Sequence, residues 1–359
     1  MSLTQLEVSL LRNLSEVALT PGAAINLLHG ANGSGKTSLL EAIHLLGVGR
    51  SFRTLKARRL VQDNQVAAVV FGRTQAGHAL GVQKSATGET VVRVNGRSGV
   101  TLAELAQQLP VQLFDPESLS ILAGPSQPRR QLLDWGVFHV EHAFQALWLR
   151  AQRALQQRNS LLKTAKIHNL EMQVWEDELA VASESLHGQR EAFMARWLPF
   201  LDDAFARLLP DIALRVEYHP GWDLSQPLME QLRLQRERDR ERGFTQMGHH
   251  RDDLRIRCQG AAVDERLSRG QLKLAACALK LSLVQCLQQA GRTQPVLLLD
   301  DLPSELDVDS RRKVCSWVGE LGVQAFLTCI EPVQLTGMWG SRPVRMFHVE
   351  QGRVSLADE

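Results

Sequence analysis

Two segments of this 359-residue chain carry residues whose types and spacing could hold the phosphates of a nucleotide. The first begins at Gly30 and fits the pattern G-x-x-x-x-G-K-[ST]. In such a loop the glycines let backbone N–H groups curl around phosphate oxygens, the lysine reaches the β- and γ-phosphates, and the hydroxyl can ligate Mg²⁺. We therefore predict a nucleotide-binding loop whose residues are Gly30, Ala31, Asn32, Gly33, Ser34, Gly35, Lys36, Thr37 and Ser38.

The second segment is PVLLLDDLPSELD, from Pro295 to Asp307. Asp300 and Asp301 follow four apolar residues, at the point where a buried strand would end. Asp300 is placed to hold Mg²⁺ together with Thr37, and Asp301 to orient or deprotonate an attacking water. Alone, the pair could equally be a solvated acidic turn. Beside a phosphate loop, it indicates a hydrolytic site.

Both segments need elements that bring them to one place. Residues 25–28, apolar apart from Asn26, predict a buried strand, and residues 37–46 have the apolar spacing of a helix. Residues 296–299 predict a second buried strand of the parallel type. Because ligands of open α/β sheets bind at the carboxyl ends of the strands, we expect the loop and the aspartates to meet there.

A third segment, LSRGQ from Leu267 to Gln271, opens a long apolar run that ends near Gly291. Ser268 and Gln271 form a capping-box pattern, which predicts that a helix begins here. A capped helix N-terminus beside a glycine can also receive a phosphate. The residues alone therefore leave two interpretations open: a simple cap, or half of a catalytic site whose other half lies elsewhere.

The composition indicates an ordinary soluble protein, with 44% hydrophobic residues, 22% charged residues and a net charge of +2. Any basic surface must therefore be local. Five cysteines without a C-x-x-C pair indicate reduced, buried thiols rather than disulfides or a zinc site. Charged residues interrupt the N-terminal apolar pattern, and no apolar run approaches the roughly 18 residues of a membrane span. We expect a cytoplasmic protein without a membrane partner.

A long stretch separates the phosphate loop from LSRGQ, and much of it has helical periodicity. Residues 128–166 and 170–186 predict two helices joined by the short link AKIHN, which suggests an antiparallel hairpin. The first helix is rich in arginine and lysine and the second in acids, which favours charge pairing between packed helices, although some arginines could face nucleic acid. Residues 66–94 alternate and end in Asn95-Gly96, which predicts an antiparallel side sheet.

A basic segment, GRSFRTLKARR from Gly49 to Arg59, follows the phosphate-loop helix directly. Such a cluster favours phosphate contacts without base readout, so we predict contact with DNA. A solvated face, or a role in holding nucleotide, remains open. The candidate residues are Arg50, Arg53, Lys56, Arg58 and Arg59.

The order of these motifs resembles that of ABC-type ATPases: a phosphate loop, L-S-x-G-Q, an acidic strand, then S-x-L-D ending at Asp307. A head of this type split by a helical insertion resembles the SMC-like DNA-repair ATPases, and among them the RecF family, over nearly the whole chain. The segments that carry the resemblance are LRNL, GANGSGKTSLLEAIHLL, GRSFRT, PVQLFDPE, RRQLLDWGVFH, LQQRNSLLK, GHHRDDL, LSRGQLKL and LLLDDLPSELD.

The fold class implied is α/β. An ABC-type P-loop ATPase head, with a parallel core sheet and an antiparallel side sheet, is interrupted by a helical arm domain. We place the head at residues 1–125 and 245–359 and the arm, with its helix hairpin, at residues 126–244.

The resemblance also implies a site shared between two chains that dimerise on ATP and Mg²⁺. By it, Gln112 or a residue close to it occupies the lid-loop position that senses Mg²⁺ and water, and Thr328 stands where transporters carry a histidine. Asp301 replaces the usual glutamate, so we expect slow hydrolysis. The residues implied to act on the nucleotide of the second chain are Ser268, Arg269, Gly270, Gln271 and Asp307.

The function implied is that of an ATP-dependent clamp on single-stranded, gapped or junction DNA. It would work with RecO and RecR to place RecA during recombinational repair, replication-fork maintenance and the SOS response. The alternatives are a transporter ATPase subunit, which should lack the insertion, and a phosphate-loop kinase, which should lack LSRGQ.

Two further features are assigned by weaker signals. The mixed charges of residues 231–243 predict a solvated helix. His249 and His250 could form a metal site, but the resemblance favours an entry to a strand near the nucleotide.

Overall fold

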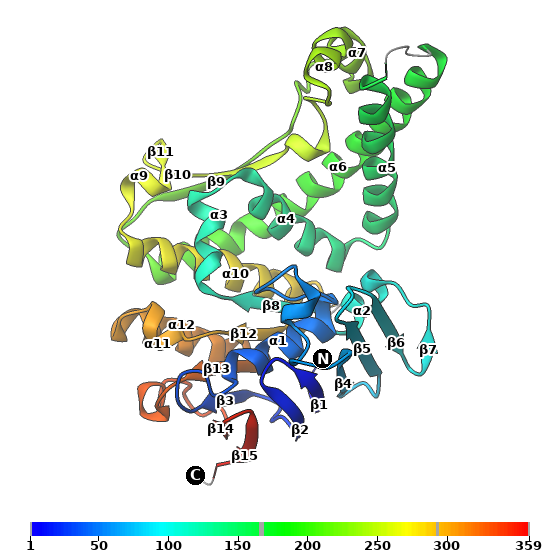
Figure 1. Ribbon diagram of the computed structural model, residues 1–359. Helices are drawn as coiled ribbons and strands as arrows, with labels where there is room; N and C mark the ends of the chain where they lie inside the picture. The colour runs from blue at the N-terminus through cyan, green and yellow to red at the C-terminus, as the bar shows by residue number, and fades with distance from the viewer. Residues whose placement is uncertain (1, 165–168, 292–293, 358–359) are drawn as a thin grey trace. The chain divides into compact units, whose positions relative to one another are not determined.

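The structure, a computed structural model, describes residues 2–164, 169–291 and 294–357. The chain forms two compact units, Met1–Ser118 with Leu287–Glu359 and Leu119–Cys286, which we call the head unit and the arm unit (Figure 1). The arm unit is wider than the predicted insertion of residues 126–244 because the helix after LSRGQ packs within it. There Trp197 Nε1 donates to Ser282 Oγ at 3.0 Å. Residues 126–244 remain our proposed extent of the insertion.

Two six-stranded sheets make the head unit. The side sheet is antiparallel and has the order β2-β1-β4-β5-β6-β7. Its strands are β1 (Leu3–Leu11), β2 (Leu14–Leu19), β4 (Ala67–Thr74), β5 (Ala79–Ser85), β6 (Thr90–Val94) and β7 (Arg97–Ser98). Asn95 and Gly96, both with positive φ, turn the chain from β6 into β7. The predicted side sheet and its Asn-Gly turn are therefore confirmed.

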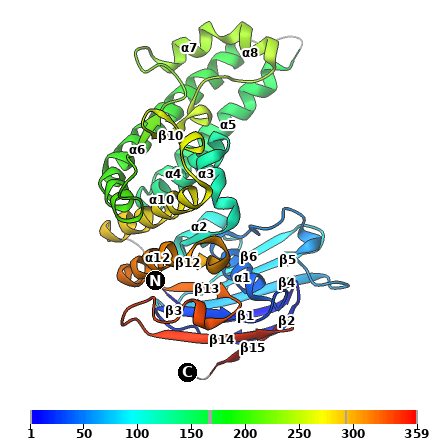
Figure 2. The ribbon, with the colours of Figure 1, turned by 90° about the vertical axis from the view of Figure 1, so that its left-hand side faces the viewer.

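The core sheet has the order β15-β14-β3-β13-β12-β8 and is parallel except for its β15 edge. Strands β3, β13 and β14 run side by side in Figure 2. The six strands are β3 (Ile25–His29), β8 (Val111–Phe114), β12 (Val296–Leu299), β13 (Ala325–Cys329), β14 (Val344–Glu350) and β15 (Arg353–Leu356). The predicted strands at residues 25–28 and 296–299 are β3 and β12.

One helix, α1 (Lys36–Val48), is covered by apolar side chains of both sheets. It is buried almost all round, at Leu39, Leu40, Ile43, Leu45 and Leu46, as a helix in the middle of a core must be. The remaining helical segments of the head unit are η1 (Ala57–Arg59), α2 (Leu102–Gln108), η2 (Pro116–Leu119), α11 (Leu302–Glu305), α12 (Val308–Leu321) and η4 (Pro332–Gln334).

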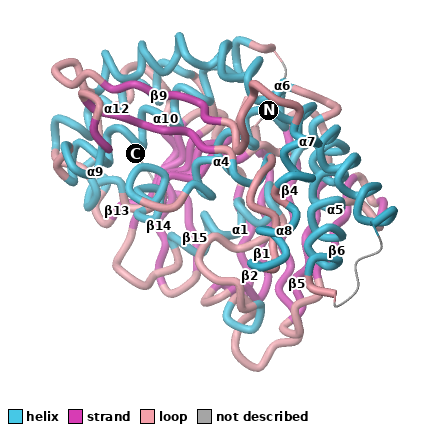
Figure 3. Tube along the Cα trace, turned by 90° about the horizontal axis from the view of Figure 1, so that it is seen from above, coloured by secondary structure: helices cyan, strands magenta, loops and turns pink. Residues whose placement is uncertain are grey.

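Helices dominate the arm unit, and a three-stranded antiparallel sheet of order β11-β10-β9 accompanies them. Strand β9, labelled in Figure 3, pairs along its whole length with β10, from Leu214 opposite Cys258 to His219 opposite Asp253. Its elements are α3 (Ser120–Ala123), α4 (Ser126–Val140), α5 (Phe144–Leu162), α6 (Asn169–Leu208), β9 (Leu214–His219), α7 (Leu228–Leu234), α8 (Arg236–Arg242), η3 (His249–Arg251), β10 (Asp253–Cys258), β11 (Ala261–Ala262), α9 (Val263–Arg266) and α10 (Arg269–Gln289).

The predicted helix hairpin is formed by α5 and α6, and its link at residues 165–168 lies outside the described residues. Arg150 Nε lies 2.8 Å from Glu178 Oε1, so charges do pair across the packed helices as expected. Two single-helix predictions were wrong. The described part of residues 128–166 contains two helices, α4 and α5, because the chain is extended at Glu141 between them. Residues 231–243 are helical and largely exposed as predicted, but they form two helices, α7 and α8, on either side of Gln235. Within them Asp239 is not solvated, because it is buried against Arg158.

All five cysteines are buried, as predicted, and no two of them form a disulfide. Across residues 2–164, 169–291 and 294–357, no helix combines the length and apolarity that crossing a membrane requires.

Candidate functional site

The phosphate loop joins β3 to α1 and depends on glycines at its tight points. Gly30 has φ 147°, and a Cβ there would lie 2.2 Å from the carbonyl oxygen of Val349 in β14. Gly35, with φ 122°, lies immediately before the first residue of α1. Side chains at these positions would drive the loop off its supports. The conformation predicted from G-x-x-x-x-G-K-[ST] is therefore present.

The side chain of Lys36 folds back over the phosphate loop. Its Nζ donates to the carbonyl oxygens of Gly30 at 2.8 Å and Ala31 at 2.9 Å. Burial lowers the pKa of the Lys36 ammonium, although Asp301 and Asp300 act in the opposite direction. A partly desolvated cation fixed at the start of a helix is well placed to attract phosphate oxygens.

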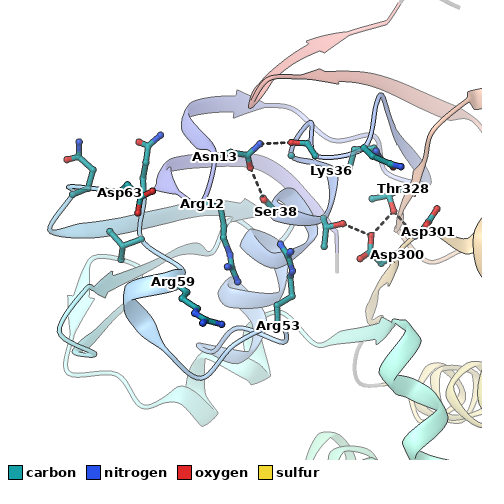
Figure 4. A pocket seen from close by; sticks show the side chains of 17 residues that line it. Arg12, Asn13, Lys36, Ser38, Arg53, Arg59, Asp63, Asp300, Asp301 and Thr328 are labelled. Atoms are coloured by element: carbon teal, nitrogen blue, oxygen red, sulfur yellow. Dashed lines mark hydrogen bonds between the residues drawn. The ribbon is translucent and has the colours of Figure 1, made fainter.

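Two distant segments support the loop. Asn13, between β1 and β2, donates from Nδ2 to the carbonyl oxygen of Ser34 at 3.1 Å. Its Oδ1 accepts from Ser38 Oγ at 3.0 Å (Figure 4). Gly352, in the turn before β15, donates its N–H to the same Ser34 oxygen at 2.8 Å. The Oγ of Ser34 is buried and has no hydrogen-bond partner. We did not identify Asn13 from the sequence, although LRNL contains it.

The two aspartates lie at the carboxyl end of β12, next to the loop (Figure 4). Asp300 Oδ1 accepts from Thr37 Oγ1 at 3.0 Å and from Thr328 Oγ1 at 2.8 Å. Thr328 Oγ1 also accepts from the backbone N–H of Asp301 at 2.7 Å. Asp301 has φ 49°, a left-handed conformation that aspartate tolerates better than most residues. Thr328 thus ties the two aspartates together.

Burial raises the pKa of the Asp300 carboxyl, while the hydroxyls of Thr328 and Thr37 act to lower it. A buried carboxylate with a raised pKa gains from a cation beside it. The oxygens of Thr37 and Asp300 converge, and hard oxygen ligands of this kind are those that Mg²⁺ prefers. The residues present therefore fit a magnesium ion.

These groups line a pocket of about 920 Å³. The pocket also contains Arg12, whose guanidinium forms two hydrogen bonds of 2.8 Å to the buried carboxylate of Glu41. Of the predicted DNA-binding residues, Arg53 and Arg59 line this pocket, whereas Arg50, Lys56 and Arg58 line a neighbouring groove. The structure therefore divides the basic segment between two cavities.

Gln112 is not brought to the pocket. It lies inside β8, paired with Leu297 of β12, and its side chain is buried. The carboxyl end of β8 is reached two residues later, because the N–H of Asp300 donates to the carbonyl oxygen of Phe114. A residue from β8 that faced the nucleotide would have to lie beyond Phe114.

The LSRGQ segment caps α10 as predicted. The N–H of Ser268 donates to Gln271 Oε1 at 2.8 Å, and the N–H of Gln271 donates to Ser268 Oγ at 3.3 Å. Ser268, Arg269 and Gly270 are exposed, and no atom lies near a Cβ built on Gly270. The segment belongs to the arm unit and the phosphate loop to the head unit.

Asp307 is the N-cap of α12, accepting from the N–H groups of Asp309 at 3.1 Å and Ser310 at 2.9 Å. These hydrogen bonds hold the pKa of Asp307 below its ordinary value.

His249 and His250 precede β10, as predicted, but within the arm unit. His249 is buried between Gln152 and Ser183, and burial lowers the pKa of its imidazole to about 2. Among the residues that the structure describes, no cluster of histidine, cysteine and acidic side chains could hold a metal ion.

Comparison with known proteins agrees with this geometry. Residues 2–355 match the family described as RecF/RecN/SMC N terminal domain. The DNA replication and repair protein RecF of Stutzerimonas stutzeri is 44% identical, over 99% of this chain and 97% of that protein. RecF of Pseudomonas aeruginosa is 43% identical, over 99% and 98%.

Solved structures give the same result. One described as the recombination mediator protein RecF-ATP in the RecFOR pathway has a TM-score of 0.87 at 26% identity, covering 99% of this chain and 98% of that one. An Smc head bound to a domain of ScpA has a TM-score of 0.61 at 15% identity, covering 99% and 97%, and shares the fold. The chain therefore belongs to the RecF family, with the fold of an SMC-like ABC ATPase head.

Proposed function

We propose that this protein is an ATP-dependent DNA-binding protein of recombinational repair and replication-fork maintenance. The observation that carries the proposal is the convergence of Lys36, Thr37 and Asp300 on one pocket from α1 and β12. The RecF-ATP structure, which has the same fold, supports ATP as the nucleotide.

In this proposal the loop N–H groups and Lys36 bind the β- and γ-phosphates. Thr37 and Asp300 hold Mg²⁺, which neutralises phosphate charge when bound. Asp301 orients the attacking water, and Thr328 keeps both aspartates in position. Because the aspartate side chain is short, and Thr328 stands where a transporter carries the histidine that contacts the γ-phosphate, hydrolysis is slow and ATP acts as a timing switch. Gln112 has no part in it.

A second copy of the chain completes the site. The exposed start of α10, at Ser268, Arg269, Gly270 and Gln271, is an N–H-rich helix end suited to a γ-phosphate. Asp307 caps α12 in the head unit and thereby shapes the turn at the start of that helix. ATP therefore acts as the link between two chains in a symmetric dimer.

The DNA substrate is single-stranded, gapped or junction DNA. The partners are RecO and RecR, with which the protein supports RecA loading in the SOS response, in the cytoplasm. The RecFOR pathway, named for the related RecF structures, supports the partner assignment. The basic segment beside the pocket supports the DNA assignment.

Mixing two inactive variants tests the shared site. Lys36→Met removes the phosphate lysine, and Ser268→Arg blocks the start of α10. Each variant alone should lose DNA-stimulated ATP hydrolysis. In an equal mixture, heterodimers contain one site with both intact halves, so hydrolysis should return to roughly a quarter of the wild-type rate.

Two outcomes would contradict the shared site. If Ser268→Arg alone still dimerises with ATP in sedimentation experiments, or if the mixture stays inactive, the site is not shared between chains. Mixing Lys36→Met with Lys36→Ala is the matched control, because neither chain then supplies a phosphate lysine.

A further inference from the structure

The basic segment after α1 is anchored at both ends. At its start, the carbonyl oxygen of Arg50 lies 2.8 Å from His44 Nδ1 of α1, and Ser51 Oγ donates to the buried carboxylate of Glu41. At its end, the carbonyl oxygen of Leu60 accepts from the N–H of Arg12 at 2.8 Å. The two anchors therefore fix the position of the residues between them.

The middle of the segment forms one wall of a groove of about 540 Å³. Arg50, Lys56 and Arg58 line the groove from this segment, and it is also lined by Lys84 at the end of β5 and Thr87 in the turn between β5 and β6. The turn is fixed by the N–H of Ala86, which donates to the carbonyl oxygen of Val66 at 2.8 Å. Two anchored segments, distant in sequence, thus line one groove.

The charged side chains among the described lining residues of the groove are all positive. None of its described lining residues is acidic, and none of Arg50, Lys56, Arg58 and Lys84 forms an ion pair with a described residue. By contrast, Arg12 and Arg53 on the nucleotide side are both within 4 Å of Glu41, at 2.8 and 3.7 Å. Four uncompensated cations in one cavity favour an anion with several charges.

Leu55 lines the same groove and is 98% exposed. A single exposed leucine is ordinary on a protein surface. Here it is flanked by the cations that would hold a phosphate backbone, so it can contact a base that is not stacked in a duplex. The groove also has neither a glycine loop nor paired aspartates, the features that hold nucleotide in the first pocket.

We propose that this groove binds a single-stranded segment of DNA, with Arg50, Lys56, Arg58 and Lys84 holding phosphates and Leu55 contacting an unstacked base. The inference rests on the proposed DNA-binding function and sharpens it. It adds Lys84, which lies outside the basic segment, and Leu55, which lies within the segment but was not a candidate residue, and it assigns Arg53 and Arg59 to the nucleotide pocket.

Lys84→Gln tests the phosphate contact, with Arg97→Gln as control because Arg97 is exposed in the same sheet but does not line the groove. The probe is fluorescent oligothymidylate, titrated over a range of salt concentrations with saturating ATP. Lys84→Gln should weaken binding about fivefold at low salt and reduce the slope of log affinity against log salt by about 0.7. Arg97→Gln should change neither.

Leu55→Ser tests the base contact. It should weaken oligothymidylate binding about fivefold without changing the salt slope, and leave blunt duplex binding unchanged. Equal loss on both substrates would refute the base contact. If Lys84→Gln matches Arg97→Gln while the wild type binds DNA, the groove assignment fails and the proposed function stands. If the wild type binds no DNA, both fail. ATP-analogue binding and the unfolding midpoint, unchanged in all variants, show that the fold is intact.

Discussion

The nucleotide pocket of the head unit and the hairpin of the arm unit use the same charged residue types in opposite ways. In the hairpin, Arg158 is fully buried and bonds to Asp239 Oδ2 at 2.7 Å, Glu176 Oε1 at 3.1 Å and Thr245 Oγ1 at 2.8 Å. Each of these acids is also buried, and Arg236 adds a second cation at Glu176. The charges of this network satisfy one another.

In the pocket, the charges satisfy one another only in part. Lys36 bonds to backbone carbonyls, and Asp300 accepts only from neutral hydroxyls. The difference teaches how to separate a structural cluster from a binding site. A cluster whose donors and acceptors balance stabilises the fold, whereas one that leaves charge uncompensated awaits a ligand.

Breaking the balanced cluster should have the largest effect on stability. Arg158→Met leaves Asp239 buried without its cation, so we expect the free energy of unfolding to fall by about 3–5 kcal/mol. Urea denaturation followed by tryptophan fluorescence measures it. Arg150→Met, which breaks an exposed pair on the same helix, is the control and should change the midpoint little. Equal midpoints for the two variants would contradict the structural role of the network.

The corresponding change in the pocket should affect binding and spare the fold. Lys36→Met should weaken the binding of a fluorescent ATP analogue about 100-fold, because a charge-assisted contact to phosphate contributes on the order of 3 kcal/mol. Its urea midpoint should match the wild type. A lowered urea midpoint with unchanged ATP affinity would show instead that Lys36 stabilises the fold and does not bind phosphate.

Asp300→Asn should trade function for stability. Because burial raises the Asp300 pKa in the folded state, its stabilising contribution is present below the unfolded value of 3.8 and is lost as pH rises through the raised value. The ionised carboxylate therefore destabilises the nucleotide-free protein at neutral pH, and the asparagine removes this cost.

The variant should thus unfold at a higher temperature than the wild type near pH 7, with the difference narrowing as the pH is lowered through the raised pKa of Asp300. Its Mg²⁺-dependent ATP affinity should fall at least about tenfold. Scanning calorimetry across pH and ATP titration with and without Mg²⁺ measure the two effects. A variant less stable than wild type at neutral pH would contradict the assignment.

Thr328→Val should have the smallest effect. It removes the hydroxyl that joins Asp300 to Asp301, so hydrolysis should slow about tenfold, equivalent to about 1.4 kcal/mol, while ATP affinity stays within about twofold. Thr328→Ser retains the hydroxyl and should retain the rate in a single-turnover assay. If serine fails as valine does, Thr328 acts through packing.

Local patterns predicted the elements that carry the site, because their information lies within a few residues. The apolar runs at residues 25–28 and 296–299, the glycine loop and the capping box at Ser268 all depend on near neighbours. The sequence did not reveal Asn13, Arg12 or the pairing of Thr328 with Asp300, since these contacts join residues far apart in the chain.

Charge patterns were harder to interpret than apolar ones. Residues 231–243 read as a solvated helix, yet Asp239 is buried, because only the fold brings Arg158 opposite to it. The basic cluster at residues 49–59 read as one surface, yet its arginines face two cavities. The sequence shows how many charges a segment carries, but the segment that packs against it in the fold determines whether each charge is compensated.

The phosphate loop also depends on two strands far along the chain. Gly30 fits closely against Val349 of β14, and Gly352, before β15, supports Ser34, so the loop lacks two of its supports until this strand pair has packed beside β3. A chain whose β14–β15 pair is not in place cannot hold ATP in this geometry. Assembly of the nucleotide pocket therefore waits for a strand pair that does not itself line the pocket.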